Sequence, residues 1–276
     1  MKLKYFVILH IISIMGLGVS CTKIDTGSDN PVPLLKVGEV TTTGSLYNIQ
    51  FYSRDSLFVG YNKVYFKVTE KVSGKSASGA SIFLHPLMNM GTYSHACPFE
   101  NPGETPNQDG YFEGAVLFSM PGSGKSWSLS AGIIVNGIRD SANFVIEKVI
   151  ATTPAKKIVV IDSLSNGPGS WIITKYPVSL VEPEKWKVGN NTFEITVHKM
   201  ASMMSFPCCT NFTVEITPEM PSMGHGSPNN VNPVSTGMGH YSGTVNFTMT
   251  GPWRVNMIFR IGDRMIGKKV YFDINV

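Results

Sequence analysis

Hydrophobic and polar residues alternate with a period of two along most of this chain, which is the pattern of a β-strand buried on one face. In the first half, the predicted inward-facing rows are Val64, Phe66 and Val68; Ile82 and Leu84; Phe112, Val116, Phe118 and Met120; and Trp127, Leu129, Ile133 and Val135. In the second half, they are Phe193, Ile195 and Val197; Phe212, Val214 and Ile216; Tyr241, Val245, Phe247 and Met249; and Trp253, Val255, Met257, Phe259 and Ile261. Such faces must be buried against each other, so the pattern predicts an all-β protein.

The two halves repeat the same blocks in the same order. Residues 47–68 align with 176–197 without a gap, residues 80–90 align with 212–223 with one added residue, and residues 110–120 align with 239–249. Trp127 then matches Trp253. Repeats of this size predict two tandem immunoglobulin-like β-sandwich domains, at residues 36–150 and 158–276, with a linker at 151–157.

The N-terminus has the pattern of an export signal. Lys2 and Lys4 precede a short apolar run that closes on Ser20 and Cys21. The small residue before the cysteine resembles the bacterial lipobox, which implies a signal peptide at 1–20, lipidation of Cys21 and a polar tether at 21–35. We therefore expect a lipoprotein of the cell envelope, on the outer membrane and held only by its lipid, with plain secretion as the alternative.

Composition argues against two functional classes. The net charge is +4 with no basic cluster, so we expect no nucleic-acid partner. Acidic residues occur singly, and no Ser, His and Asp set occurs in both halves. We therefore expect no enzyme and no catalytic residues.

One loop of the second half is rich in soft donor atoms. Met220, Met223 and His225 lie in "EMPSMGHG", among Pro and Gly residues that offer no apolar neighbours, and Met238 and His240 lie across the same connection. A thioether needs no deprotonation and suits Cu(I), and imidazole can complete the set. These five residues are the predicted copper site; a Met-rich contact surface is the alternative.

The first half offers a weaker second metal site at His85, Met88, Met90 and His95. Its histidines do not align with those of the second half, because His85 aligns with Thr217 and Tyr111 aligns with His240. The alternative is a scaffold domain without a metal.

Other sulfur atoms lie in "HKMASMMSFPCC", which contains Met200, Met203, Met204, Cys208 and Cys209. This stretch is either a sulfur-rich edge or a flexible apolar loop. With Cys97, three thiols remain after lipidation, so at least one cannot pair within the chain. A disulfide, soft-metal binding by Cys208 and Cys209, and free thiols all stay open. His198 follows a strand, where we expect a solvated side chain.

Residues 218–259, with "PEMPSMGHGSP", "GHYSGTVNFTM" and "GPWRVNMIF", resemble the YtkA-like domain, an exported β-sandwich related to the FixH-like group and often linked with copper handling. The resemblance implies the fold, export and a connection with copper. The first half departs from it with "LMNMGTYSH" and "GSGKSW".

Together these patterns predict an exported, lipid-anchored, non-catalytic protein that binds copper as a carrier or sensor. Its partner would be the metal ion or a metal-handling protein of the envelope. The alternative is an interaction or adhesion module of the cell envelope without metal.

Overall fold

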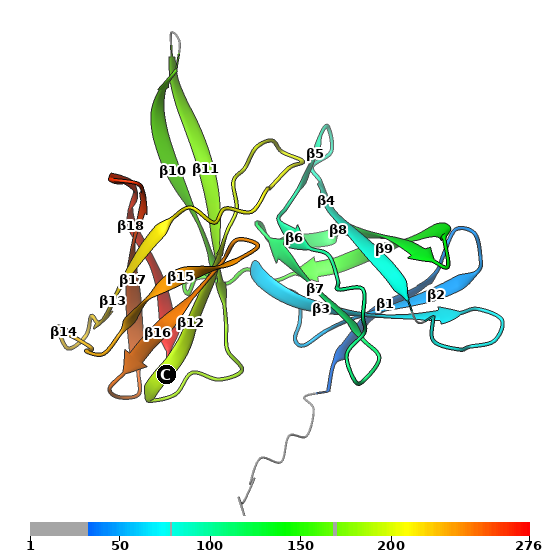
Figure 1. The fold of residues 1–276 in the computed structure, drawn as a ribbon, viewed down its shortest axis with the longest axis horizontal. Helices are drawn as coiled ribbons and strands as arrows, with labels where there is room; N and C mark the ends of the chain where they lie inside the picture. The colour runs from blue at the N-terminus through cyan, green and yellow to red at the C-terminus, as the bar shows by residue number, and fades with distance from the viewer. Residues whose placement is uncertain (1–32, 78, 168–169) are drawn as a thin grey trace, which may run out of the picture. The chain divides into compact units, whose positions relative to one another are not determined.

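The computed structural model describes residues 33–77, 79–167 and 170–276, and its regular elements are all β-strands (Figure 1). The all-β prediction is confirmed. The predicted signal peptide, Cys21 and the tether up to residue 32 lie outside the described residues. Within the described ranges, no helix has the length and apolar character needed to cross a membrane.

The first sandwich is built from two antiparallel sheets. The five-stranded sheet has the order β1 (Leu35–Thr41), β2 (Tyr47–Ser53), β3 (Gly60–Glu70), β7 (Phe112–Phe118) and β6 (Phe99–Glu100). The four-stranded sheet has the order β5 (Ser94–Ala96), β4 (Ala80–Asn89), β8 (Gly122–Val135) and β9 (Ile138–Val149).

The second sandwich repeats this arrangement strand by strand. Its five-stranded sheet has the order β10 (Ile158–Gly167), β11 (Ser170–Val181), β12 (Gly189–Val197), β16 (His240–Phe247) and β15 (Val231–Gly237). Its four-stranded sheet has the order β14 (His225–Gly226), β13 (Thr213–Met220), β17 (Pro252–Ile261) and β18 (Arg264–Asn275). Each strand of the first sandwich therefore has a counterpart nine strands later, as the sequence repeat predicts.

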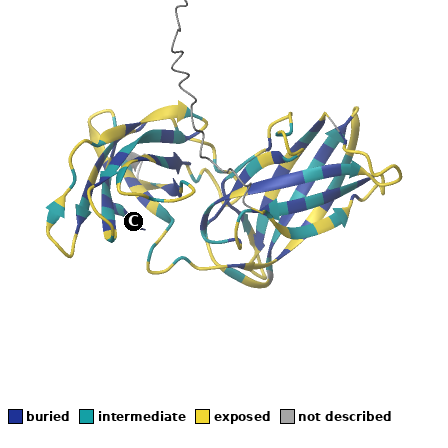
Figure 2. Ribbon diagram, turned by 90° about the horizontal axis from the view of Figure 1, so that it is seen from below, coloured by how far each residue is buried: buried dark blue, intermediate teal, exposed yellow. Residues whose placement is uncertain are grey.

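Each sandwich has its own core of alternating side chains (Figure 2). The predicted inward rows are buried apart from three residues: Ile261 is half-buried, and Met120 and Met249 are 39% and 37% exposed. The alternation fails at the two methionines because β7 ends at Phe118 and β16 ends at Phe247. Their carbonyl oxygens instead accept hydrogen bonds from the indole Nε1 of Trp127 (3.1 Å) and Trp253 (3.0 Å).

Two buried asparagines hold equivalent places in the two sandwiches. The Asn62 side chain accepts a hydrogen bond from the backbone N–H of Phe58 and donates to the carbonyls of Phe58 and Gly60. Asn191 accepts from the N–H of Lys187 and donates to the carbonyls of Lys187 and Gly189. Each asparagine thus satisfies the backbone of the segment that leads into β3 or β12, which would otherwise leave polar groups buried without partners.

Residues 33–276 form a single compact unit, in which residues 150–157 connect β9 to β10. The boundaries at 36–150, 151–157 and 158–276 stay predictions.

Candidate metal centre

In the second sandwich, the candidate metal centre is a cluster of Met220, His225 and Trp253. We call this cluster the second corner, because the first sandwich contains an equivalent cluster, the first corner. Met220 at the end of β13 pairs in register with His225 at the start of β14. The imidazole and the Trp253 indole form a T-shaped pair, with 5.7 Å between ring centroids and an interplanar angle of 77°. A hollow of about 460 Å³ at this hairpin is lined by residues 217–221 and 224–226. A thioether, an imidazole and an aromatic ring thus meet beside an open hollow.

Burial accounts for Met220, contrary to the expectation that it lies in a loop without apolar neighbours. Strand β13 continues through Met220, so the alternation that buries Val214 and Ile216 also turns Met220 inward. Its side chain is 2% exposed, belongs to the core and lies next to Gly251. The sulfur atom is therefore fixed by packing rather than displayed on the surface.

Met223 lies in the tight turn between β13 and β14. Its N–H and that of Gly224 both donate to the Met220 carbonyl, at 3.1 and 3.0 Å, and Gly224 takes a positive φ of 65°. The Met223 side chain is 61% exposed. It is the one predicted donor that lies free beside the second corner.

Met238 and His240 lie far from this corner. They occur at the turn between β15 and β16, where His240 pairs with Thr196, whereas the other end of β16 at Phe247 packs against Trp253. The strand between them has 8 residues, so the two ends are roughly 23 Å apart at a rise of about 3.3 Å per residue. The five predicted ligands therefore do not surround one point in this structure.

Both ring nitrogens of His240 are hydrogen-bonded to carboxylates. Its Nδ1 lies 2.6 Å from Oε1 of Glu194, and its Nε2 lies 2.9 Å from Oε1 of Glu100. The hydrogen bonds to Glu100 and Glu194 raise the pKa of His240 to about 9, although burial opposes the shift. A doubly hydrogen-bonded, protonated imidazole has no free lone pair for a metal ion.

The first sandwich contains an equivalent arrangement, the first corner, formed by Met88, His95 and Trp127. Met88 on β4 pairs with His95 on β5 and with Trp127 on β8. The His95 and Trp127 rings form a T-shaped pair, with 5.6 Å between centroids and an angle of 87°. The linear alignment missed the match between His95 and His225, because the chain from methionine to histidine is two residues longer in the first sandwich.

The other two donors predicted in the first half lie elsewhere. His85 is exposed on the opposite face of β4, where it pairs with Ser130. Met90 is 38% exposed in the turn after β4. Of the four predicted residues, the structure brings together Met88 and His95.

His198 is 3% exposed, contrary to the predicted solvated side chain. Its Nδ1 is buried without a hydrogen-bond partner, and burial lowers the pKa of this histidine to about 4. His198 is buried where the segment before β13 folds back, and the backbones of His198 and Cys208 form an isolated β-bridge there. Cys97 is buried, Cys208 is exposed and Cys209 is half-buried, and all three are free thiols.

The donor types fit a soft cation better than a hard one. Within residues 33–77, 79–167 and 170–276, no three or more His, Cys, Asp or Glu side chains gather in a way that could hold a metal ion. What each corner offers is thioether sulfur with one imidazole, a set that suits Cu(I). The residues of the second corner therefore fit copper, whereas the separated pair Met238 and His240 does not.

The comparisons with known proteins bear on the half that holds the second corner. Residues 170–257 match the YtkA-like family model. The YtkA-like segment thus runs from β11 into β17 and includes Met220, His225 and Trp253. A search of curated proteins found no match. Among solved structures, the chain is similar to invasin, a bacterial integrin-binding protein, at 13% identity and a TM-score of 0.24; the likeness covers 83% of this chain and 38% of invasin.

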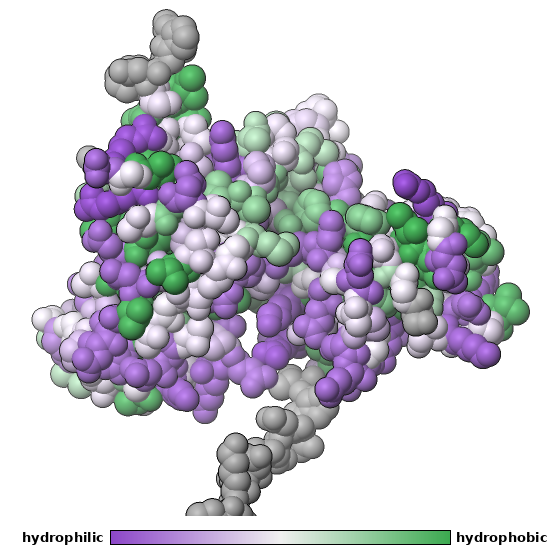
Figure 3. Space-filling model, in the orientation of Figure 1, coloured by the Kyte–Doolittle hydropathy of each residue, from purple (hydrophilic) through white to green (hydrophobic). Residues whose placement is uncertain are grey.

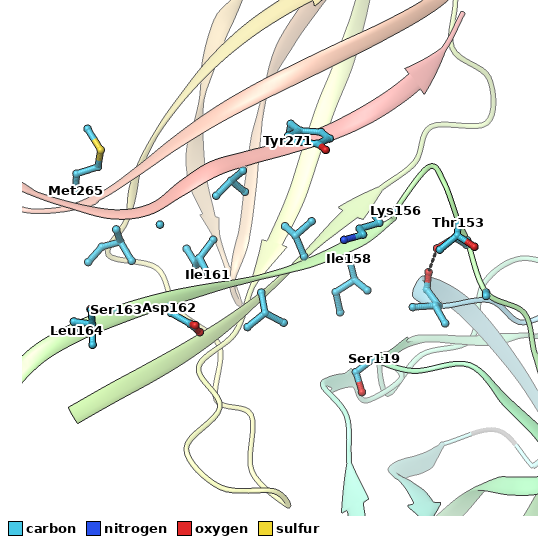
Figure 4. Close-up of a pocket in the computed structure, with 18 of the residues that line it drawn as sticks. Ser119, Thr153, Lys156, Ile158, Ile161, Asp162, Ser163, Leu164, Met265 and Tyr271 are labelled. Atoms are coloured by element: carbon cyan, nitrogen blue, oxygen red, sulfur yellow. Dashed lines mark hydrogen bonds between the residues drawn. The ribbon is translucent and has the colours of Figure 1, made fainter. Parts of the chain in front are cut away.

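A further cavity lies outside both corners, beside the start of the YtkA-like segment. It has a volume of about 1050 Å³ and is lined by β10, β18, the linker and three residues of the first sandwich. Ile158, Ile161 and Tyr271 are among its apolar lining residues in Figure 4, and Lys156, Asp162 and Arg264 are its charged ones. None of the predicted metal donors lines this cavity.

Proposed function

We propose that this protein is an exported, lipid-anchored envelope protein that binds copper at the second corner, as a carrier or sensor rather than an enzyme. The observation that carries the proposal is the register pairing of Met220 with His225 beside Trp253. The YtkA-like match over the same residues supports an exported sandwich.

The second corner has the features of a soft-ion site. Packing fixes the Met220 sulfur, and the exposed Met223 side chain is long and flexible enough to move over the hollow. A cation held by His225 near the Trp253 face would also gain from the ring's quadrupole. When bound, copper would supply its own affinity for thioether and imidazole, while the protein supplies a fixed sulfur, an orientable imidazole and a mobile second sulfur.

The test is a titration of the full chain with Cu(I) in competition with a chromogenic chelator. We expect Met223→Leu and His225→Gln each to weaken Cu(I) binding at the second corner by at least about ten-fold. Loss of a residue that only supports a metal ligand already lowers metal affinity by about that factor. Met265→Leu, a surface methionine 49% exposed outside both corners, is the matched control and should leave the affinity unchanged. Unchanged affinity in both corner variants would remove this site from the proposal.

An interaction module is the second candidate, supported by the β10–β11 hairpin. Four aliphatic side chains are about half exposed there: Val160, Leu164, Ile172 and Ile173. Apolar surface is visible along this hairpin in Figure 3, and surface of this kind often marks a contact site. A photo-crosslinking residue at Leu164 should capture one discrete envelope protein, and Ile173→Asp should abolish the product. Absence of any product would leave copper binding as the sole proposal.

A further inference from the structure

We propose that the first sandwich holds a second soft-cation site at the first corner, and that its ligands are Met88, His95 and a methionine of the loop 199–209. The inference rests on the proposed function for the chemistry of the ligand. Its location rests on separate observations in the first sandwich, outside the YtkA-like segment.

The first observation is an orphaned nitrogen on His95. Its Nδ1 lies 2.9 Å from the carbonyl oxygen of Ala96. A carbonyl oxygen only accepts, so Nδ1 carries the proton and the neutral ring has its lone pair on Nε2. Nε2 is buried and has no hydrogen-bond partner. A buried polar atom without a partner is costly and calls for an explanation such as an ion.

The second observation is the fixed thioether across the strand pair. Met88 pairs in register with His95 and is 6% exposed. Side chains that face each other across an antiparallel pair lie about 4.5–5.5 Å apart at Cβ, so the sulfur and the imidazole share one small volume. The Trp127 ring beside them is fully buried, and its Nε1 is already satisfied by Met120, which leaves its face as an apolar wall.

The third observation accounts for the methionine-rich loop. The N–H of Ala96, the residue after His95, donates to the carbonyl of Met203 at 2.8 Å. Met203 and Met204 are 43% and 46% exposed, so their side chains are not committed to a core. This backbone bond places flexible thioethers within a side chain's length of His95. The loop of the second sandwich thus brings further sulfur atoms to the first corner, besides Met90 in the β4–β5 turn.

The equivalence of the corners sharpens the inference. Both have a methionine paired with a histidine and a histidine that forms a T-shaped pair with the tryptophan at nearly the same separation. The second corner has Met223 in its own turn as the mobile donor, and we assign that role at the first corner to Met203 or Met204, whose loop is hydrogen-bonded to the residue after His95. One full chain would therefore bind two soft cations.

The test measures the Cu(I) stoichiometry of the full chain by chelator competition. We expect two equivalents for the wild type, one for His95→Gln, one for Met88→Leu, and one for His225→Gln. Met88→Leu keeps the core volume and so separates loss of the sulfur from loss of the fold. His85→Gln, on the opposite face of the same strand, is the matched control and should retain two. The Met203→Leu/Met204→Leu double variant should weaken the His95 site and spare the His225 site.

The outcomes separate the two proposals. Two outcomes would overturn the first-corner site and leave the proposed function standing. One is that folded His95→Gln and Met88→Leu still bind two equivalents of Cu(I). The other is that the wild type binds one equivalent, which only His225→Gln loses. A single equivalent lost only in His95→Gln would support the first corner and overturn the second. No binding at all would overturn both.

Discussion

The imidazole Nε2 of His240, in the second sandwich, lies 2.9 Å from Oε1 of Glu100, 140 residues earlier in the first sandwich. The other ring nitrogen lies 2.6 Å from Glu194 on the neighbouring strand β12. Tyr61 donates a hydrogen bond to the second oxygen of Glu100 at 2.9 Å. One protonated imidazole thus joins carboxylates of both sandwiches.

The pH dependence of unfolding should report this imidazole. The pKa of His240 is raised to about 9 from 6.5, so between these values the folded protein holds a proton that the unfolded chain releases. The stabilisation is fully present below pH 6.5 and is lost as the pH rises through 9. We expect the free energy of unfolding to fall by about 1–3 kcal/mol over that window.

The measurement is urea denaturation from pH 6 to pH 9.5. His240→Gln should remove most of the slope, and His85→Gln should keep it. A wild-type slope that persists in His240→Gln would show that other groups carry it.

His198 should act on the acid side. Burial lowers the pKa of His198 to about 4, so between pH 6.5 and 4 the unfolded chain binds a proton that the folded protein does not bind. Stability is present above pH 6.5 and is lost as the pH falls toward 4. His198→Gln should therefore lose less stability than the wild type between pH 6.5 and 4.5, by about 1–2 kcal/mol, in urea denaturation at matched ionic strength. Parallel curves for the two proteins would contradict a buried neutral imidazole.

Two strand glycines should respond differently to a methyl group. A Cβ on Gly243 would clash with the carbonyl oxygen of Val231 and with Pro233, whereas a Cβ on Gly132 would lie 3.8 Å from the Phe83 carbonyl oxygen. Gly243→Ala should destabilise the protein by about 1–3 kcal/mol, as overpacking does. Gly132→Ala should be neutral or slightly stabilising. If Gly243→Ala changes the free energy of unfolding no more than Gly132→Ala does, then β15 moves away from the added methyl group without destabilising the protein.

Lipid anchoring makes a prediction about fractionation. In cells that process the leader, wild-type protein should incorporate labelled fatty acid and sediment with membranes. Cys21→Ser should lose the label and leave the membrane fraction, while Cys208→Ser should behave as wild type. Wild-type protein in the soluble fraction without label would support plain secretion.

The strands and the repeat could be predicted from the sequence because both rest on alternation and on spacing along the chain. Alternation alone identifies nearly all of the buried residues in the rows from Val64 to Val135 and from Phe193 to Phe259. The exceptions, Met120 and Met249, follow the ends of their strands, and strand ends are set by pairing that a linear pattern does not contain.

The candidate site was harder to predict because it depends on register. Proline and glycine follow Met220, a pattern that predicts a loop, yet β13 extends through Met220 and packing buries its side chain. His95 and His225 differ in their distance from the preceding methionine, so an alignment that follows residue order separates them. The signal that the two halves share in the sequence is a histidine soon after each methionine-rich turn, with a tryptophan later in the same half.

The paired asparagines Asn62 and Asn191 have a consequence for how this protein can change over evolutionary time. Each one secures the entrance to a central strand through its own side chain, without contribution from the β4–β5 or β13–β14 turn. Those turns can accept insertions and exchanges of residues while the framework persists. A duplicated gene would then be free to keep one turn for its ancestral task and to adapt the other to a new one.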